Sequence, residues 1–181
     1  MSLKTRVIQA VVCSVASVLA IAFNLDDALG VSENGLKHIA NEEGCRLSAY
    51  QCSANVWTIG LGHTQGINQD TVFTLDDAAE SFVESVASAE NVVKRRIKQT
   101  PSQGEYDMMV SFVYNLGAGN FASSTLLKKF NQNDRTGACE QYPRWVFVNG
   151  KDCRIDDSNC AGIPKRRAIE REVCLNDWEG V

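Results

Sequence analysis

The sequence has little of what a metal centre or a nucleic-acid interface needs. Among its 181 residues there are only two histidines, and no two of its seven cysteines have the CxxC spacing that is typical of zinc ligands. The formal net charge is −4, so the overall basic balance of a nucleic-acid-binding domain is missing. Internal repeats and low-complexity segments are also absent from the sequence. We therefore expect no metal ion, no cofactor and no nucleic-acid partner.

What is present is the composition of a globular domain, with 44% hydrophobic and 22% charged residues. The chain beyond an oily N-terminal run is long enough for one domain with a sizeable core, and nothing in it demands more than a monomer. The seven cysteines indicate disulfides and hence an oxidising compartment. Because seven is an odd number, at least one thiol is unpaired at any time.

The oily run extends from Val7 to Phe23, and Gln9 is its one polar amide. Lys4 and Arg6 precede the run and two aspartates follow it, a charge bias that places the N-terminus in the cytoplasm and the rest outside. As a helix the run would extend about 26 Å, slightly less than a hydrocarbon core of roughly 30 Å. On its own sequence the run fits either a membrane anchor or a signal peptide cleaved after the A-x-A-like segment Ala20–Ala22.

Periodicity and turn-forming residues predict the regular elements that follow the run. The expected stretches are a helix over residues 31–43, a hairpin sheet over 46–64, a long helix over about 75–98 and a mainly helical remainder over 103–180. Ser32 is a candidate N-cap of the first helix, and Thr74 and Asp77 have capping-box spacing at the start of the long one. Gly117, Gly119 and Gly150 are expected to interrupt the remainder.

Glu43 ends the apolar stripe of the first expected helix, whereas Glu42 is turned about 100° away from that stripe. Burial against an apolar face disfavours the charged form of a carboxylic acid, so that such a group can donate a proton near neutral pH. A negative charge at the C-terminal end of a helix is otherwise unfavourable. Glu43 is therefore a candidate general acid; the alternative is a glutamate that only interacts with the helix end.

The residues around Glu43 resemble the active-site segment of phage-type lysozymes. That family carries a Glu, then after eight residues an Asp or Cys, and after five more a Thr; the corresponding positions here are Glu43, Cys52 and Thr58. The resemblance covers roughly residues 32–178. It rests on Glu43-Gly44, Arg46-Leu47, Ala49-Tyr50, Thr58-Ile59-Gly60, Gly62-His63-Thr64, Phe112 to Gly117, Phe121, Ser124 to Leu127, Arg144-Trp145, and Arg166-Arg167 with Glu170.

The resemblance implies a muramidase, which hydrolyses the β-1,4 bond between N-acetylmuramic acid and N-acetylglucosamine in peptidoglycan. It implies an α+β fold in which a long helix joins a small sheet-bearing lobe to a larger helical lobe. It assigns Glu43 as the general acid on the glycosidic oxygen, with Cys52 and Thr58 positioning and activating a water on the far side of the sugar. An unperturbed thiol has a pKa of about 8.5, so Cys52 is a weak substitute for the commoner Asp and is expected mainly to orient that water.

One branch of the family, the signal-anchor-release endolysins, resembles this chain further. Its members begin with a weakly hydrophobic helix that inserts into the membrane and later leaves it, and a cysteine of that helix can regulate a cysteine of the active site. The resemblance implies a tethered state with Cys45 bonded to Cys52, and a released state in which Cys13 has attacked Cys45 and freed Cys52. Cleavage after Ala22 would remove Cys13, which favours the retained anchor over the cleaved signal peptide.

This interpretation divides the chain into two parts. Residues 1–29 would be the signal-anchor-release segment, which contacts the host inner membrane through residues 7–23 with its N-terminus in the cytoplasm. Residues 30–181 would be the catalytic domain, periplasmic while tethered and released to the periplasm afterwards. The other four cysteines are expected to form two structural bridges, with Cys153–Cys160 closing a short loop and Cys139–Cys174 joining the last helical segments, although the sequence alone does not fix this connectivity.

Several further residues have both a structural and a functional interpretation. Tyr106, Asn115 and Phe121 are candidates for substrate binding, with core packing as the default for the two aromatic residues. His63 is expected to fix a turn or a salt bridge more than to act as a base. Arg144 and Trp145 are expected to pack the larger lobe. Lys165, Arg166 and Arg167 are expected to lie on a solvated helix face or to bind an anionic polymer such as cell wall.

Two other functions remain open. A cysteine peptidase acting on wall peptides would use Cys52 as the nucleophile and His63 as the base, but it leaves Glu43 and Thr58 without a task. A non-catalytic wall-binding protein derived from a lysozyme would have no need for a caged thiol.

Overall fold

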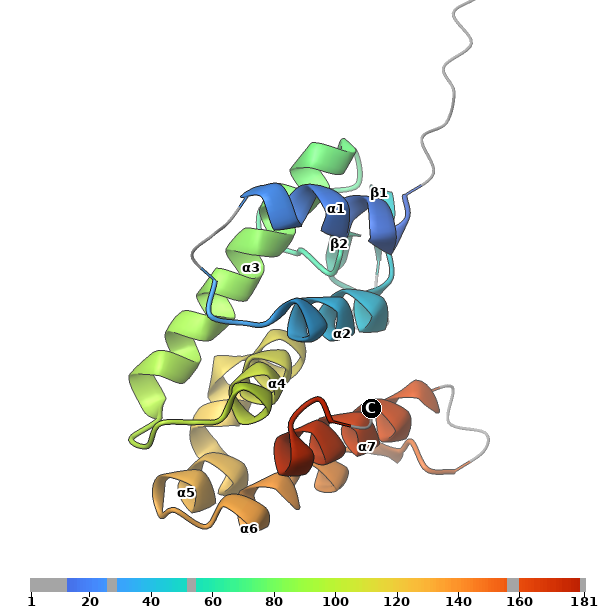
Figure 1. The fold of residues 1–181 in the computed structure, drawn as a ribbon. Coiled ribbons are helices and arrows are strands. Elements are labelled where there is room, and N and C mark those ends of the chain that lie inside the picture. The colour runs from blue at the N-terminus through green and yellow to red at the C-terminus, as the bar shows by residue number, and fades with distance from the viewer. Residues whose placement is uncertain (1–12, 26–28, 52–54, 156–159, 180–181) are drawn as a thin grey trace, which may run out of the picture.

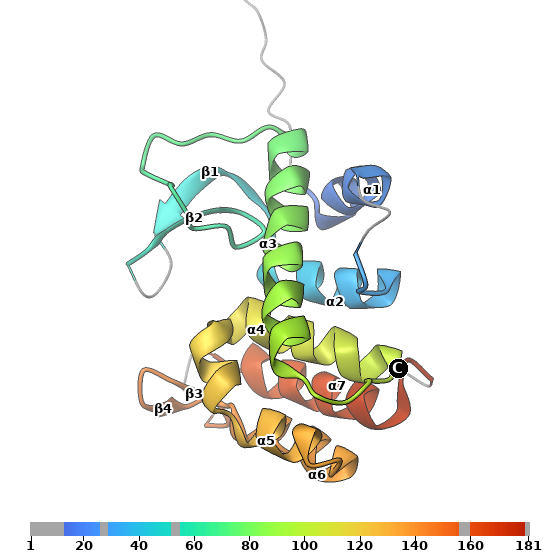
Figure 2. The same ribbon diagram turned by 90° about the vertical axis from the view of Figure 1, so that its left-hand side faces the viewer.

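The computed structural model describes residues 13–25, 29–51, 55–155 and 160–179 (Figure 1). In chain order the elements are α1 (Val15–Leu25), α2 (Glu33–Glu43), β1 (Arg46–Gln51), β2 (Trp57–Gly60), α3 (Leu75–Arg96), α4 (Gln103–Ser123), α5 (Thr125–Asn131), α6 (Arg135–Cys139), the 3-10 helix η1 (Tyr142–Arg144), β3 (Phe147–Val148), β4 (Lys151–Asp152) and α7 (Gly162–Asn176). The long helix α3 joins a small lobe with the β1–β2 sheet to a larger helical lobe (Figure 2). The expected α+β fold is confirmed.

Helix α2 begins and ends where its caps dictate. The Ser32 hydroxyl accepts a hydrogen bond from the Gly35 amide at 3.1 Å, which satisfies one of the free N–H groups of the first turn. Ile39 lies on the buried stripe of the helix and is 0% exposed. At the other end Gly44 has a φ of 70°, a conformation that suits glycine and lets the chain leave the helix directly after Glu43.

Helix α3 is fixed at its start by the expected capping box. The Thr74 hydroxyl accepts from the Asp77 amide at 3.1 Å, and the Asp77 carboxylate accepts from the Thr74 amide at 2.8 Å. Phe82, Val86 and Val93 lie in the core at 0–1% exposure. The helix ends at Arg96, two residues earlier than the periodicity predicted, and Ile97 caps it in an extended conformation.

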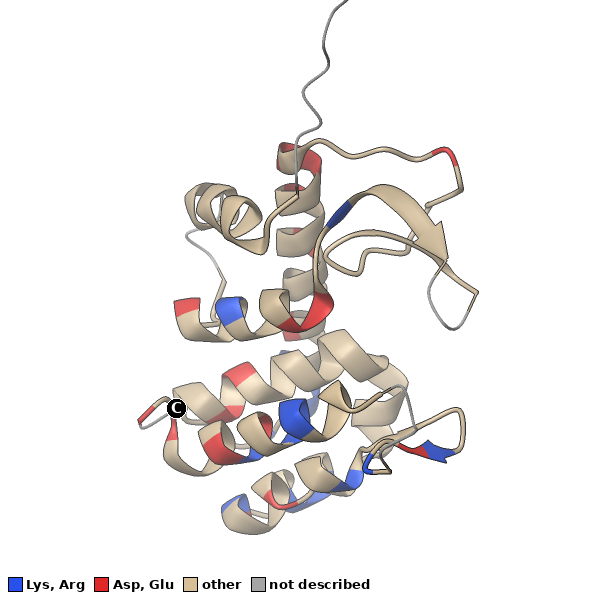
Figure 3. Ribbon diagram, turned by 90° about the vertical axis from the view of Figure 1, so that its right-hand side faces the viewer, with Lys and Arg blue, Asp and Glu red and all other residues tan. Residues whose placement is uncertain are grey.

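Two small antiparallel sheets lie on the same side of α3 (Figures 2 and 3). In the first, β1 pairs with β2, and Tyr50 stands opposite Thr58. The second is the β3–β4 hairpin, which interrupts a stretch that we expected to be mainly helical. Its turn is made by Asn149 and Gly150, both with positive φ, a dipeptide that matches the twist of a two-residue hairpin.

Helix α1 packs against α3 through one face and presents the other to solvent. The buried residues are Val18, Leu19 and Ala22, and the exposed ones include Ala16, Ala20 and Asn24. The helix carries no charged residue (Figure 3). Among the residues that the structure describes, no helix is both long and apolar enough to cross a membrane.

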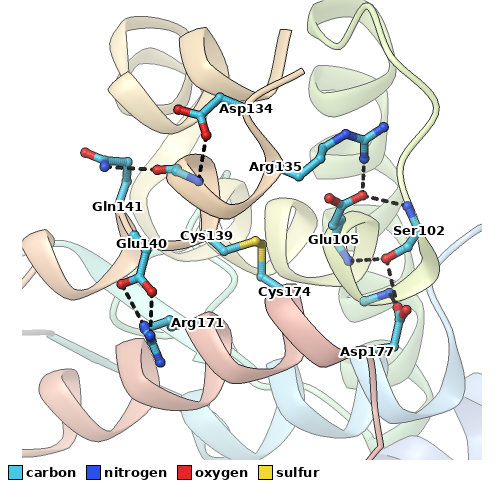
Figure 4. The surroundings of a disulfide bond; sticks show 12 residues. Ser102, Glu105, Asp134, Arg135, Cys139, Glu140, Gln141, Arg171, Cys174 and Asp177 are labelled. Atoms are coloured by element: carbon cyan, nitrogen blue, oxygen red, sulfur yellow. Dashed lines mark hydrogen bonds and ion pairs between the residues drawn. A yellow bond between two sulfur atoms is a disulfide. The ribbon is translucent and has the colours of Figure 1, made fainter. Parts of the chain in front are cut away.

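Two disulfides brace the larger lobe. Cys139 at the end of α6 is bonded to Cys174 of α7, with the two Cα atoms 5.5 Å apart (Figure 4). Cys153, just after β4, is bonded to Cys160, just before α7. Both pairings are those that we expected for these four cysteines. They tie the last helix to the body of the lobe, and that helix carries the arginines described next.

Candidate active site

Glu43 lies at the junction of the two lobes, where α2 ends. Its side chain is 19% exposed and points toward Gly62, just after β2. Gly62 has a φ of 90°, and a Cβ atom built there would come within 3.1 Å of the Glu43 Oε2 atom. A side chain at position 62 would therefore be strained and would crowd the carboxylate. Glu42, the neighbouring residue, is exposed, so the two glutamates have the different orientations that the helical spacing predicted.

The partner of Glu43 is Arg166 of α7, whose Nη1 atom lies 2.9 Å from the Glu43 Oε1 atom. Arg166 is 2% exposed and Arg167 is 1% exposed. Neither the solvated-face nor the polymer-binding interpretation holds for these two residues, because both guanidinium groups are buried among carboxylates. Lys165 alone of the three is exposed. Arg166 is thus part of the site, holding the Glu43 carboxylate in one orientation.

A buried network continues from Arg166 to Glu170, one turn further along α7. The Arg166 Nε atom donates to the Glu170 Oε1 atom at 3.2 Å, the Ser111 hydroxyl donates to the same oxygen at 2.9 Å, and Arg167 forms an ion pair with the other oxygen. Burial disfavours the charge on Glu170, but the guanidinium groups of Arg167 and Arg166 outweigh it and hold the pKa of Glu170 well below its ordinary value. Two guanidinium groups therefore face two carboxylates, those of Glu170 and Glu43.

A cleft of about 340 Å³ opens beside Gly62, between the loop after β2 and the helices α3 and α4. Its lining includes Gly62, Thr64, Gln65, Glu84, Tyr114 and Gly117. The Tyr114 hydroxyl donates to the Leu61 carbonyl at 2.5 Å and so fixes α4 to this loop. Burial, with the nearby charge of Glu43, raises the pKa of Tyr114 above its ordinary value, so the hydroxyl keeps its proton. Gly117, at a φ of 82°, kinks α4 at the rim.

The other two residues assigned to catalysis belong to the β1–β2 hairpin. Thr58 of β2 is 4% exposed, and its hydroxyl donates to the Val56 carbonyl at 3.1 Å. Cys52 follows the last residue of β1 and lies outside the described residues. The bond that the structure does describe here joins Cys13, just before α1, to Cys45, just before β1.

His63 is engaged by groups of its own lobe. Its Nδ1 atom lies 3.4 Å from the Ser85 hydroxyl oxygen, and its Nε2 atom lies 3.1 Å from the Gln65 carbonyl oxygen. Its backbone also pairs with that of Ile59. These contacts are those of a residue that fixes a turn.

The three residues proposed for substrate binding have different surroundings. Phe121 is 0% exposed and packs on Phe112 with the ring centroids 6.1 Å apart, and Tyr106 is 8% exposed beside Glu90 of α3. The structure thus places both aromatic side chains in the core, the default alternative. Asn115 is partly buried, and its side-chain oxygen accepts a hydrogen bond from Arg167.

Trp145 packs the larger lobe as expected, with its ring perpendicular to that of Phe112 at 4.9 Å. Arg144 does not, since its side chain is exposed and contacts Gln141 at 3.3 Å. The contacts of Arg166 and Tyr114 at this site were not predicted from the sequence. The signal for Arg166 was available only in part: its spacing to Glu170 predicts a pair along one helix, but its contact with Glu43 spans 123 positions.

The arrangement suits proton donation to a ligand in the cleft. The Glu43 carboxylate lies against Gly62, which lines the cleft, and the buried guanidinium of Arg166 fixes the orientation of this carboxylate. Within the described part of the chain, no three His, Cys, Asp or Glu side chains are grouped so as to hold a metal ion.

Comparisons with known proteins identify the family of this chain. Residues 40–170 match the family model described as phage lysozyme. The chain is 39% identical to an endolysin of Acyrthosiphon pisum secondary endosymbiont phage 1 over 79% of its own length and 96% of the relative's. It is 31% identical to a SAR-endolysin of Haemophilus phage HP1, over 92% of this chain and 96% of that one.

Among solved structures, the crystal structure of the active form of the P1 phage endolysin Lyz superposes with a TM-score of 0.78. The match covers 91% of this chain and 94% of that chain at 24% identity, and it shows that the fold is shared. With the family model covering most of the sequence, the protein belongs to the phage lysozyme family and is a glycoside hydrolase of the lysozyme type.

Proposed function

We propose that this protein is an endolysin that hydrolyses the β-1,4 bond between N-acetylmuramic acid and N-acetylglucosamine in peptidoglycan, with Glu43 as the general acid. The observation that carries the proposal is the position of the Glu43 carboxylate, held by Arg166 beside Gly62 at the edge of the cleft. A glycosidic oxygen bound there would receive the proton of Glu43 as the bond to the sugar breaks.

Thr58 and Cys52 are proposed to position the water that attacks the opposite face of the sugar. The paired register of β1 and β2 supports this role for Thr58, because it fixes the strand opposite the end of β1, after which Cys52 follows. A neutral thiol accepts a hydrogen bond only weakly, so Cys52 would orient the water and not deprotonate it.

We further propose that the enzyme is made as an inactive, tethered form. Residues 1–29 would act as a signal-anchor-release segment, held in the host inner membrane through residues 7–23 with the N-terminus in the cytoplasm. Residues 30–181 would form the periplasmic catalytic domain, released later as a monomer. The similarity to relatives named SAR-endolysin supports this proposal, as does the Cys13–Cys45 bond, which links the anchor segment to the edge of the active site.

Activation would be a disulfide exchange with no net oxidation. In the tethered form Cys45 is bonded to Cys52, which blocks the catalytic thiol. After release, the thiolate of Cys13 attacks the Cys45 sulfur, the Cys13–Cys45 bond forms, and the Cys45–Cys52 bond breaks. The electron pair leaves with the Cys52 sulfur, which takes up a proton. The structure would then correspond to the active state, since its disulfide is the product of this step.

The products of digestion test the activity directly. Purified peptidoglycan treated with the protein should yield new reducing sugar ends that carry N-acetylmuramic acid, and the Glu43→Gln variant should yield almost none. New amino groups without reducing ends would instead identify a peptidase. The contacts of His63 with Ser85 and Gln65 give that alternative no support, because both ring nitrogens are already engaged. Release of neither product, with the wall polymer only retained, would identify a binding protein.

A further inference from the structure

His38 is a buried histidine of α2 with no part in the proposed mechanism. It is 8% exposed, and its ring lies edge-on to Trp178 with the centroids 6.4 Å apart. Within the part of the chain that the structure describes, its Nε2 atom has no hydrogen-bond partner. The atom faces the Glu170 Oε1 atom at 3.9 Å, which is too long for a hydrogen bond. Since unpaired polar atoms are costly in the interior, a proton added here would gain a carboxylate that is already in place.

The oxygen that His38 faces is the one that Glu170 shares with Arg166. The Arg166 Nε atom donates to Glu170 Oε1 at 3.2 Å while its Nη1 atom holds Glu43 at 2.9 Å. The guanidinium of Arg166 therefore contacts two carboxylates at once. A new hydrogen-bond donor to Glu170 Oε1 would weaken the Arg166–Glu170 contact and so change the contact between Arg166 and Glu43. His38 and Glu43 both belong to α2, and the contacts that connect them run through Glu170 and Arg166 of α7.

On α2 itself, Glu42 lies four positions after His38, one helical turn further along, and is exposed to solvent. The charged groups that face His38 from the other elements are already paired. From α7, Arg166 and Glu170 face α2, as described above. From α4, Asp107 faces the start of α2 and accepts hydrogen bonds from Ser32, Gln103 and Trp178. Helix α1, which also packs on α2, has no charged residue. Glu170 is therefore the carboxylate that a protonated His38 would engage.

We propose that His38 is a positioning residue that couples the surrounding pH to Glu43, an inference that rests on the proposed role of Glu43. Protonated His38 donates to Glu170 Oε1 and displaces the Arg166 Nε atom from that oxygen. Arg166 then forms its ion pair with Glu43 alone. The buried cluster then holds three cations against two carboxylates. Both changes oppose the uncharged form of Glu43 that is needed for proton donation. Hydrolysis should therefore decline on the acid side as His38 takes up its proton.

Titration of the imidazole by NMR tests the coupling without any assay of activity. The chain has two histidines, so His63→Gln leaves His38 as the one ring to be followed in the full-length protein. Thermodynamic coupling is reciprocal, so removing the charge of Glu43 must make His38 harder to protonate. Added to that background, Glu43→Gln should move the His38 midpoint to lower pH by on the order of half a unit or more. Glu33→Gln removes an equal charge from the exposed side of the same helix, five positions before His38 where Glu43 is five positions after it, and should leave the midpoint in place.

The pH profile of hydrolysis gives the functional readout. His38→Gln, which stays neutral, should match the parent near pH 8 and be several-fold more active than the parent near pH 5.5. If this variant does not fold, His38→Asn serves the same purpose. Equal His38 midpoints in the Glu43→Gln and Glu33→Gln proteins, or parallel pH profiles of parent and variant, would overturn the proposal. If no protein releases reducing sugars, the proposed function fails, whereas the midpoints still decide whether His38 and Glu43 are coupled.

Discussion

The Cys13–Cys45 and Cys139–Cys174 disulfides close loops of nearly equal length in very different surroundings. Their cysteines are 32 and 35 positions apart in the sequence. In the chain-entropy model each bond would stabilise the fold by about 3.5 to 4 kcal/mol through its effect on the unfolded chain. However, Cys139 and Cys174 belong to packed helices and are 1% and 9% exposed, whereas Cys13 and Cys45 stand just outside regular elements and are half-buried.

The difference shows that loop length does not decide what a disulfide is for. Exchange needs an attacking thiolate in line with an accessible sulfur, so burial between α6 and α7 protects one bond, and partial exposure at the edge of the β1–β2 sheet leaves the other open to attack. The first bond therefore suits a switch and the second suits a brace.

The largest effect is expected at Glu43. The residual hydrolysis rate of its variant is the baseline with which the rates of the disulfide variants are compared. Glu43→Gln keeps the shape of the side chain but removes the proton donor, so the rate of hydrolysis should fall by about 10² to 10⁴. The rate of reducing-sugar release measures it. Glu42→Gln is the matched control and should stay within a few-fold of the parent; an inactive Glu42→Gln beside an active Glu43→Gln would reverse the assignment.

The next largest effect is expected at the exposed bond. Cys13→Ser should leave Cys45 bonded to Cys52, which gives a protein that is released but lyses poorly. Cys13→Ser combined with Cys45→Ser has no caging partner and should regain activity, as measured by the lysis of cells that express each variant. If the double variant is as inactive as Cys13→Ser alone, the bond is a brace like its counterpart and the exchange mechanism fails. Cys52→Ser should be weak in every background.

The buried bond should behave in the opposite way. Cys139→Ala with Cys174→Ala should lower the free energy of unfolding by about 2 to 5 kcal/mol, while the rate per folded molecule stays close to that of the parent. Denaturant titration gives the first quantity and sugar release below the transition gives the second. Loss of activity in a folded double variant would mean that this bond also shapes the site, through α7 and Arg166.

The smallest effect per residue is expected in α1, the helix that follows Cys13, and it concerns retention in the membrane. Replacing Ala16, Ser17 and Ala20 by Leu adds apolar area worth on the order of 1 kcal/mol or more for each residue in the membrane. Because Ala16 and Ala20 are exposed in the docked helix, the same leucines gain little there. The triple variant should remain in the membrane fraction. Its control is the same triple in the Cys13→Ser, Cys45→Ser background, where membrane retention should persist although the cage is gone. A mature chain that starts at Phe23 by mass spectrometry would contradict retention of the anchor altogether.

The sequence predicted those parts of the fold that rest on local rules. The cap at Ser32, the capping box of Thr74 and Asp77, and the apolar stripe that ends at Glu43 all involve neighbours within a few positions, and the structure has each of them. The β3–β4 hairpin was missed although Asn149-Gly150 is a strong local signal, because the strands that flank it are only two residues long and carry no clear alternation.

The parts of the site that escaped prediction rest on distant contacts. Arg166 and Arg167 were interpreted from their own helix, where a run of basic residues usually faces solvent. Their burial depends on Glu43 and Asn115, which lie more than 50 positions away. Burial of a charged side chain requires an oppositely charged or hydrogen-bonding group beside it, and sequence spacing along one helix does not reveal such a group on another helix.

On the proposed route, helix α1 has to be compatible with two environments, the lipid bilayer and the surface of the folded protein. On the proposed route it first stands among lipid chains and afterwards lies between water and α3. Its outward face in the second setting, Ala16, Ala20 and Asn24, must also be tolerable in the first, and Asn24 bonds its side-chain amide to the Ala20 carbonyl of its own helix at 2.7 Å. Charge on this face would hinder insertion, and bulk would hinder departure. Small uncharged side chains suit both environments. Residue types are therefore restricted on both faces of α1, on the inner face by packing and on the outer face by the membrane.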